Sequence, residues 1–384
     1  MRKTVCTINQ CNGCMACVSI CPQKCIEIRD TLEAVNAVIE EKSCIKCGAC
    51  KRVCPNIVRV VKQHPIEWKQ GWANSNIRNQ STSGGAASAI MEAFIKSGGY
   101  VASCQFKSGG FFFDITNDLS VIKRFAGSKY VKSNPEGIYK KIQERLKTDK
   151  VLFVGLPCQV AALKCYISHH ENLYTVDLIC HGTPSIKFLE QFLSEEGIAL
   201  QNLKNISFRT KNDRGLSVEN GLVKPPKIMD CYLCSFLEAI NYTENCYNCQ
   251  FASIERVADI TLGDSWGTEY KEEAKRGVSL ILVQTQKGRD LLKLSEIEMK
   301  NVNLDVAVAN NHQLTHPSAL SPKRNVFLWF IKNGFSYKAA TFFALPMMVF
   351  RQWIKLILIS LGFIDCKGGY GITIEYSGVK TPWN

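Results

Sequence analysis

Cysteines in the first sixty residues form the clearest chemical pattern in the sequence. They make two series with the same spacing, each closed by Cys-Pro: Cys11, Cys14, Cys17 and Cys21, then Cys44, Cys47, Cys50 and Cys54. This spacing is typical of 4Fe-4S ligands, and where two clusters are present the fourth cysteine ligates the other cluster. We therefore predict two clusters. The first takes Cys11, Cys14, Cys17 and Cys54, and the second takes Cys44, Cys47, Cys50 and Cys21.

A pair of zinc sites is the alternative for these eight cysteines. A zinc site takes four ligands and does not require the C-x2-C-x2-C-x3-C-P spacing that occurs here twice. We therefore favour iron–sulfur clusters. The segment resembles a two-cluster 4Fe-4S ferredoxin domain, with short strands expected around "CIEIRD" and "AVNAVIEEKS". Cys6 and Cys25 fall outside the pattern, and we interpret them as small buried packing residues.

The composition is that of a folded protein rich in thiols. The chain has 384 residues, 19 of them cysteine, and its start has no apolar segment typical of a signal peptide. We therefore expect reduced thiols and a cytoplasmic location. The net charge of +13 suggests an acidic redox protein, a polyanionic coenzyme or a membrane surface as partner, with solubility as the simpler explanation. The sequence contains no zinc finger, RNP-like string or basic-aromatic block, so we do not expect it to bind nucleic acid.

A turn rich in hydroxyl groups precedes a predicted helix over residues 86–96. The turn reads "STSGG" and consists of Ser81, Thr82, Ser83, Gly84 and Gly85. Hydroxyl groups, free backbone N–H groups and the helix dipole make such a start a suitable phosphate site. A capped helix with a flexible entry is the structural alternative.

Two later turns each place a cysteine between a buried strand and a helix. Cys158 follows "VLFVGLP" and Cys180 follows "LYTVDLI". Because α/β folds gather ligands at the carboxyl edge of the sheet, these two cysteines suggest one shared site. Two C-x2-C pairs follow at Cys231/Cys234 and Cys246/Cys249. They could form a zinc ribbon, or Cys158, Cys180, Cys246 and Cys249 could hold a third 4Fe-4S cluster; spacing alone leaves both open.

Five longer motifs indicate a family. The segments "STSGG", "VGLPCQVAALK", "DLICHGTPS", "CYNCQF" and "ADITLGDSWG", placed after a two-cluster ferredoxin domain, resemble the coenzyme F-420 hydrogenase/dehydrogenase beta subunit family over about residues 1–320. The resemblance implies a flavoprotein with FAD and iron–sulfur clusters, and in members that use coenzyme F-420 a deazaflavin partner with an acidic tail. It favours Cys246 and Cys249 over Cys231 and Cys234 as ligands.

The same resemblance makes "STSGG" and "GDSWG" candidate flavin contacts. In the second motif we expect Asp264, Trp266 and Gly267 at the flavin, with a structural turn as the alternative. The catalytic residues stay unknown. His181, beside Cys180, is the best acid–base candidate, although we favour a structural hydrogen bond near that turn as its role.

The last sixty residues are apolar and predicted to be helical. Their longest uncharged run, residues 339–350, has twelve residues and is too short to span a bilayer. We expect helices packed on the main domain, with peripheral membrane contact as the second possibility, and a closing strand in "YGITIEYSGVKTPWN".

The sequence predicts an α+β protein in three parts. They are a ferredoxin-like module at residues 1–62, a mixed α/β domain at 63–320 and a helical tail at 321–384. The predicted function is an iron–sulfur flavoprotein oxidoreductase that couples 4Fe-4S clusters, FAD and a hydride-type partner. The alternative is a non-enzymatic electron relay that serves a larger reductase.

Overall fold

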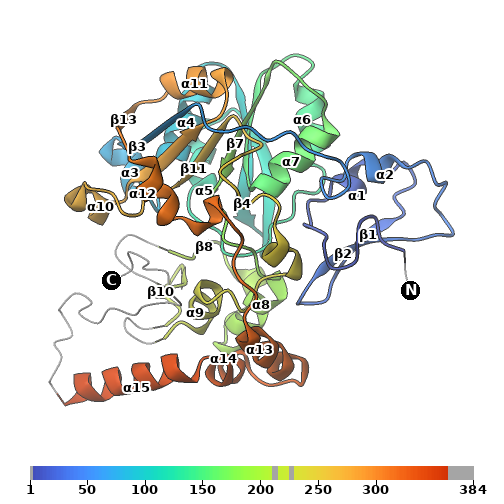
Figure 1. Ribbon diagram of the computed structural model, residues 1–384. Coiled ribbons are helices and arrows are strands. Elements are labelled where there is room, and N and C mark those ends of the chain that lie inside the picture. Colours follow the sequence, from blue (N-terminus) through green and yellow to red (C-terminus); the bar gives the residue numbers. More distant parts are fainter. Residues whose placement is uncertain (1–2, 210–214, 225–228, 362–384) are drawn as a thin grey trace.

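The computed structural model describes residues 3–209, 215–224 and 229–361 (Figure 1). Its strands are β1 (Ile26–Asp30), β2 (Val35–Ile39), β3 (Glu67–Ala73), β4 (Tyr100–Lys107), β5 (Gly110–Thr116), β6 (Val151–Gly155), β7 (Leu173–Leu178), β8 (Ile206–Ser207), β9 (Ser217–Val218), β10 (Gly221–Leu222), β11 (Ile260–Asp264), β12 (Ser279–Val283) and β13 (Ile297–Lys300).

Its helices are α1 (Ala16–Ile20), α2 (Ala49–Arg52), α3 (Ser75–Asn79), α4 (Ala86–Lys96), α5 (Ile122–Phe125), α6 (Ile138–Arg145), α7 (Pro157–Tyr166), α8 (Ile186–Glu195), α9 (Cys231–Leu237), α10 (Lys271–Arg276), α11 (Gln286–Lys293), α12 (Leu304–Ala309), α13 (Pro322–Lys332), α14 (Tyr337–Ala344) and α15 (Pro346–Ser360). Short 3-10 turns lie at Leu119–Val121, Leu200–Asn202, Glu244–Asn248 and His312–Leu314.

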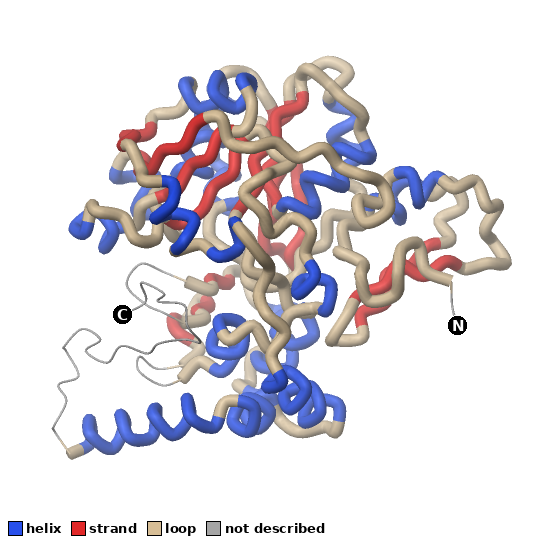
Figure 2. The backbone as a smooth tube through the Cα atoms, in the orientation of Figure 1, coloured by secondary structure: helices blue, strands red, loops and turns tan. Residues whose placement is uncertain are grey.

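A mixed sheet of eight strands forms the centre of the molecule (Figure 2). Its order is β13-β3-β12-β11-β7-β6-β4-β5. The four strands β4, β6, β7 and β11 are parallel to one another, so their carboxyl ends meet at one edge. Successive residues of β6 face opposite layers: Phe153 lies in the core beneath α6 and α7, and Leu152 in the core beneath α4 and α11.

The N-terminal module is a small unit beside this sheet. The strands β1 and β2 pair antiparallel, and α1 packs against α6 and α7 (Figure 1). Cys14 and Ala16 enter the same core as Tyr139 and Phe153. The module is therefore joined to the main domain by packed side chains, close to the cysteine at the start of α7.

A helical layer lies on the other side of the molecule from α11. The helices α8, α9, α13 and α14 share one core, in which Phe188, Tyr232, Phe327 and Tyr337 are almost fully buried. Residues from both sides of the expected boundary at 320 thus pack together. Within the described residues, no helix is long and apolar enough to cross a membrane.

The mixed α/β architecture and the helical C-terminal region confirm the predicted fold class. The helix expected over residues 86–96 is α4. The closing strand expected near the C-terminus lies outside the described residues.

Candidate functional site

The four predicted ligands of the first cluster line one small cavity in the N-terminal module. The cysteines around it are Cys11, Cys14, Cys17, Cys54 and also Cys6. Burial raises the pKa of Cys14 to about 12, and the nearby Cys11 sulfur adds to the rise. Four thiols around a single cavity are a donor set that fits a 4Fe-4S cluster.

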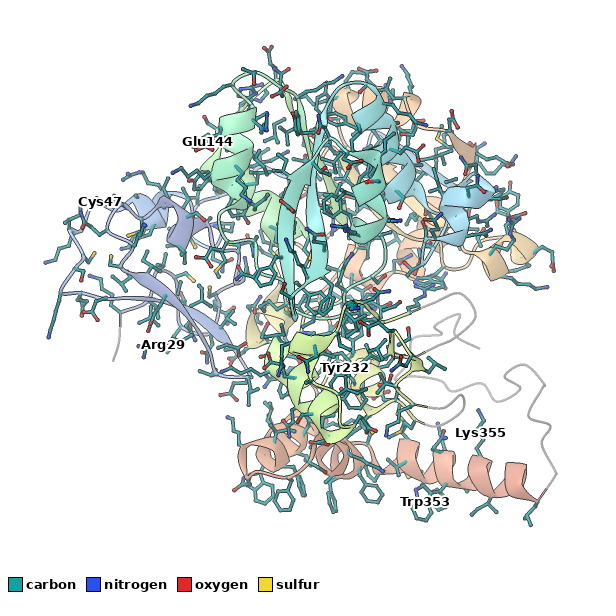
Figure 3. All side chains as sticks on the ribbon, turned by 180° about the vertical axis from the view of Figure 1, so that it is seen from behind. Arg29, Cys47, Glu144, Tyr232, Trp353 and Lys355 are labelled. Carbon is teal, nitrogen blue, oxygen red and sulfur yellow. The ribbon has the colours of Figure 1, made fainter. Side chains whose placement is uncertain are left out.

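Three predicted ligands of the second cluster also lie together. Burial raises the pKa of Cys50, and the sulfurs of Cys21 and Cys44 raise it further. Cys47 is exposed at the outer end of the module, as its label in Figure 3 shows. Across the described ranges, no three His, Cys, Asp or Glu side chains are close enough to surround a single metal ion; a four-iron cluster is larger than one ion.

Two cysteines that we interpreted as packing residues lie against these predicted ligands. Cys6 lines the same small cavity as Cys11 and Cys54, and the sulfur of Cys25 is 3.5 Å from that of Cys21. Cys25 is also buried in the small core of the module. Their spacing gave no sign of this, because neither belongs to a C-x2-C unit.

The four cysteines of the proposed third cluster come together from three separate segments. They are Cys158 at the start of α7, Cys180 after β7, and Cys246 and Cys249 in and after the turn Glu244–Asn248. The pKa of Cys158 is raised well above its usual value by burial, then by the sulfurs of Cys249, Cys180 and Cys246. The two turns thus meet at the carboxyl edge of the parallel strands, as expected from their sequence.

The zinc-ribbon grouping is not assembled. Cys231 and Cys234 lie on α9 and belong to the core of the helical layer. Cys246 packs elsewhere, with Phe236, Tyr242 and Tyr247. The structure therefore groups the second C-x2-C pair with Cys158 and Cys180 rather than with the first pair.

The loop that carries Cys246 and Cys249 also fastens the N-terminal module. The side-chain amide of Asn245 donates to Oδ1 of Asn12 at 3.3 Å, and that of Gln250 donates to the carbonyl of Pro55 at 2.9 Å. Asn12 and Pro55 are sequence neighbours of two first-cluster ligands. The same loop therefore positions both thiol sites.

Two side chains lie between the first-cluster cysteines and the third set. Tyr139 is fully buried, its pKa is raised by burial and then by Cys14, Cys158 and Cys17, and its hydroxyl has no hydrogen-bond partner among the described residues. The ammonium of Lys132 donates to the carbonyl of Asn12 at 3.2 Å. Its charge lowers the pKa of both Cys11 and Cys158, against the larger effect of burial. No sequence pattern marked either residue.

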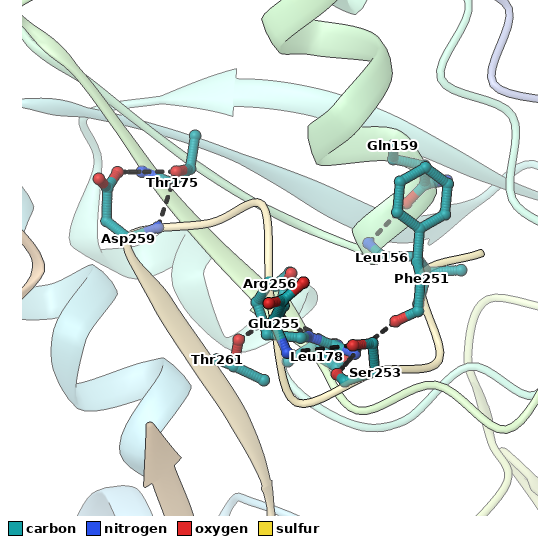
Figure 4. Close-up of polar contacts among 11 residues, drawn as sticks. Leu156, Gln159, Thr175, Leu178, Phe251, Ser253, Glu255, Arg256, Asp259 and Thr261 are labelled. Atoms are coloured by element: carbon teal, nitrogen blue, oxygen red, sulfur yellow. Dashed lines mark hydrogen bonds and ion pairs between the residues drawn. The ribbon is translucent and has the colours of Figure 1, made fainter. Parts of the chain in front are cut away.

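A buried ion pair holds the chain that follows Cys249 (Figure 4). Arg256 lies 3.2 Å from Asp177, and both side chains are almost fully buried. The guanidinium also donates to the carbonyls of Phe251 and Leu178. Burial raises the pKa of Asp177, while Arg256 and a hydrogen bond from Thr261 oppose the rise. Arg256 thereby ties the loop after Cys249 to the strand that ends before Cys180.

A cavity of about 700 Å³ opens at the same edge of the sheet. Most of the predicted flavin contacts line it: Ser81, Thr82, Ser83, Gly85, Asp264 and Trp266. Gly84 and Gly267 do not. A Cβ on Gly84 would come within 2.5 Å of the carbonyl oxygen of Gly71, so this glycine serves close backbone packing. A Cβ on Gly267, where φ is +79°, would meet the amide of Asn310.

One part of the cavity wall has groups that are suited to phosphate. It contains the start of α4, the hydroxyl of Thr82, and Ser128, whose hydroxyl lies 3.3 Å from that of Thr82. The next residue, Lys129, also lines the cavity, and burial lowers its pKa to about 8. A helix start, hydroxyl groups and a lysine are a donor set that fits a diphosphate. The sequence showed the helix start but gave no sign of Lys129.

Another part of the cavity wall comes close to the third cysteine set. Arg209 forms an ion pair with Asp264 at 2.7 Å, and its guanidinium lies over the ring of Trp266. His181, next to Cys180, lies 2.7 Å from the amide nitrogen of Gln313. Burial lowers the pKa of His181 to about 4, so its imidazole is neutral at pH 7. The hydrogen bond that we gave as its structural explanation is thus present.

Two family models match segments of this chain. Residues 148–305 match the family model for the carboxyl-terminal part of the coenzyme F420 hydrogenase/dehydrogenase beta subunit. Residues 10–58 match the 4Fe-4S dicluster domain. The recognition made from the sequence is confirmed, and this beta-subunit relative is an iron–sulfur redox protein.

Two curated relatives come from Methanocaldococcus jannaschii. One is a coenzyme F420-dependent sulfite reductase, 23% identical over 323 residues, which cover 77% of this chain and 47% of the relative. The chain thus spans about half the length of that reductase. The other is an uncharacterized protein, 22% identical over 345 residues, covering 76% of this chain and 88% of the relative.

Among the similar solved structures is a chain of the F420-reducing NiFe hydrogenase complex from Methanosarcina barkeri, with 18% identity and a TM-score of 0.45. The match covers 72% of this chain and 97% of that chain.

Proposed function

We propose that this protein is an iron–sulfur flavoprotein oxidoreductase with three 4Fe-4S clusters, FAD and a hydride-type partner. One observation carries the proposal: Gln159 and His181, the sequence neighbours of Cys158 and Cys180, line the 700 Å³ cavity, and Cys158 and Cys249 pack against the core that contains Cys14. Such an order makes one path from the N-terminal module to the cavity. A non-enzymatic relay would need the clusters but not the cavity.

The residues of the cavity have separable parts in this proposal. The start of α4, Thr82, Ser128 and Lys129 would hold the diphosphate of FAD. The aromatic and cationic wall at Trp266 and Arg209 would orient the ring system. Bound flavin supplies the exchange between hydride transfer and single-electron transfer. The hydride partner in this proposal is a deazaflavin of the coenzyme F420 type, as in the names of the relatives.

The third cluster in this proposal is held by Cys158, Cys180, Cys246 and Cys249. Lys132 would place one positive charge between this cluster and the first, where it stabilises the reduced form of each. Because His181 is neutral, it would add no second positive charge to that of Lys132 at the third cluster. The free thiolates that these clusters require exist in a reducing compartment, so the proposed location is the cytoplasm.

An acidic redox protein is the proposed partner at the outer end. Cys47 is exposed there, and Lys46, Lys51 and Arg52 are exposed around it. Ile45, which is 60% exposed, adds an apolar contact. A cationic rim around an exposed cluster ligand is suited to steering an acidic donor or acceptor.

Flavin content after anaerobic reconstitution with iron, sulfide and FAD tests the proposal. We expect about one FAD per chain, bleached by a low-potential donor. Ala87 lines the cavity in the first turn of α4, so Ala87→Phe should fill the cavity and abolish FAD binding while iron is retained. Ala93→Phe, on the same helix but away from the cavity lining, is the matched control. A wild-type preparation with full iron and no flavin would leave only the electron relay.

A further inference from the structure

The helices α13, α14 and α15 expose a large set of apolar side chains that the redox function does not use. We define the apolar face as ten residues, each between 42% and 64% exposed: Trp329, Phe335, Phe342, Phe343, Met347, Phe350, Trp353, Ile354, Ile357 and Leu361. The other sides of α13 and α14 are already occupied, because Phe327, Tyr337 and Ala340 pack in the core shared with α8 and α9. The apolar face is therefore a second, outward surface.

The apolar face is continuous across α13 and α14. Phe330 stacks on Phe343 with ring centroids 4.5 Å apart and lies 5.0 Å from Phe335, which in turn lies 6.2 Å from Trp329. Phe342 is 5.3 Å from Phe343. These contacts join side chains from both helices into one aromatic surface.

The face continues along α15 as a single stripe. Its exposed apolar residues, Met347, Phe350, Trp353, Ile354 and Ile357, follow helical spacing, and Leu361 continues it just past the helix end. This spacing places them on one side of the helix. Figure 3 shows Trp353 on the outer side of α15 and Lys355 on the opposite side. The helix is thus amphipathic, and its first turn packs against α14 and the core of the helical layer.

The charge of this region has one sign. Residues 322–361 contain six lysine or arginine residues and no aspartate or glutamate. Arg351 and Lys338 are exposed, while Lys332 pairs with Glu33 of the N-terminal module at 2.7 Å. A surface that combines Trp and Phe with cations is what an interfacial helix presents to anionic lipid. Two copies of the same face would instead bring like charges together, which opposes self-association.

We propose that the apolar face of α13, α14 and α15 binds the surface of a membrane that contains anionic lipid. The aromatic rings enter the headgroup region, and the cations contact lipid phosphates. The attachment is peripheral, since no helix among the described residues could span the bilayer. The exposed cluster cysteine, Cys47, lies at another end of the molecule (Figure 3) and stays accessible to a partner. The proposal extends the tail contact expected from the sequence to three helices and to one class of lipid.

Vesicle co-sedimentation of the full-length, cluster-loaded protein tests this proposal. The probes are vesicles of phosphatidylcholine alone and of phosphatidylcholine with phosphatidylglycerol. Wild-type protein should pellet with the anionic vesicles and at least about tenfold less with the neutral ones. The variant Phe350→Ser/Trp353→Ser should weaken anionic binding by at least about tenfold, because both side chains leave water on binding. Arg351→Glu should weaken it about three- to tenfold.

Matched variants distinguish the face from general surface effects. Phe112→Ser removes a side chain on β5 that is 42% exposed, and Lys123→Glu reverses an exposed charge on α5; both should pellet as wild type does. Equal pelleting of Phe350→Ser/Trp353→Ser and wild type would overturn the proposal.

Two other occupants would be recognised in the same series. If wild type ignores vesicles but is a dimer by sedimentation velocity, and Phe350→Ser/Trp353→Ser is a monomer, the face is a self-association surface and the proposal fails. A variant truncated after residue 361 is the second comparison. If this variant binds vesicles and the full chain does not, the segment beyond residue 361 covers the apolar face, and the proposal fails for the full chain. Pelleting needs no flavin, so neither result depends on the proposed redox function.

Discussion

The outer and inner ends of the proposed path of clusters differ in their contact with solvent. At the outer end, Cys47 is exposed among exposed basic residues. At the inner end, Cys246 is buried and Cys180 is half-buried, and burial, followed by the nearby Cys246, raises the pKa of Cys180 to about 12. An exposed cluster exchanges electrons with another protein, whereas an enclosed one exchanges them with a neighbouring group in the same chain. In our proposal, this difference places the partner surface on the module and the small-molecule chemistry at the cavity.

Removing one inner ligand should produce the largest change. We expect Cys246→Ser to lose about four irons per chain, because the third cluster would keep only three thiolates. Iron and acid-labile sulfide analysis, with electron paramagnetic resonance of the reduced protein, measures the loss. Cys234→Ser is the matched control, since this cysteine lies in the core of the helical layer. An unchanged iron count in Cys246→Ser would show that Cys246 does not hold a third cluster.

Breaking the buried ion pair should destabilise the inner end. In Arg256→Met, Asp177 keeps its buried carboxylate without a partner, so we expect a loss of about 3–5 kcal/mol in the free energy of unfolding. Arg289→Met removes a partly exposed pair with Glu67 at 2.9 Å and should cost less than about 1 kcal/mol. Chemical denaturation under anaerobic conditions compares the two. Equal losses would mean that the Arg256 pair does not hold the inner site together.

Neutralising the lysine between the two thiol sites should shift a potential rather than remove a cluster. A unit charge about 8 Å away at an effective dielectric constant of about 20 contributes about 2 kcal/mol. Lys132→Met should therefore lower the midpoint potential of the adjacent clusters by roughly 50–90 mV, since the reduced forms lose a favourable charge. Redox titration followed by electron paramagnetic resonance measures the shift. Lys141→Met, 58% exposed on α6, should leave the potentials within about 10 mV because solvent screens its charge.

Reversing charge at the outer end should have the smallest effect. Lys46→Glu should slow reduction by an acidic plant-type ferredoxin about three- to tenfold at low ionic strength, and the difference should shrink with added salt. Stopped-flow kinetics compares it with Lys123→Glu on the main domain, which should react as wild type does. A salt-independent or absent effect would show that the partner docks elsewhere.

The sequence predicted the outer end better than the inner one, for a physical reason. The eight N-terminal cysteines are close together in the sequence, so their spacing alone predicts 4Fe-4S clusters. The third set is assembled from segments up to ninety residues apart, and spacing left a zinc ribbon equally open until the family resemblance was considered. Lys129, Lys132 and Tyr139 have no motif, because each acts through its place in the fold. Cys6 and Cys25 were missed as neighbours of the clusters for the same reason.

The central claim is that the N-terminal clusters reach the cavity through the third cysteine set. Its most direct test is the rate at which bound flavin is reduced after a low-potential donor has reduced the N-terminal clusters, in Cys246→Ser and in Cys234→Ser. We predict unchanged reduction of the N-terminal clusters in both proteins, and flavin reduction at least about a hundredfold slower in Cys246→Ser alone. Flavin reduction at the wild-type rate in Cys246→Ser, with its third cluster absent by iron analysis, would contradict the claim.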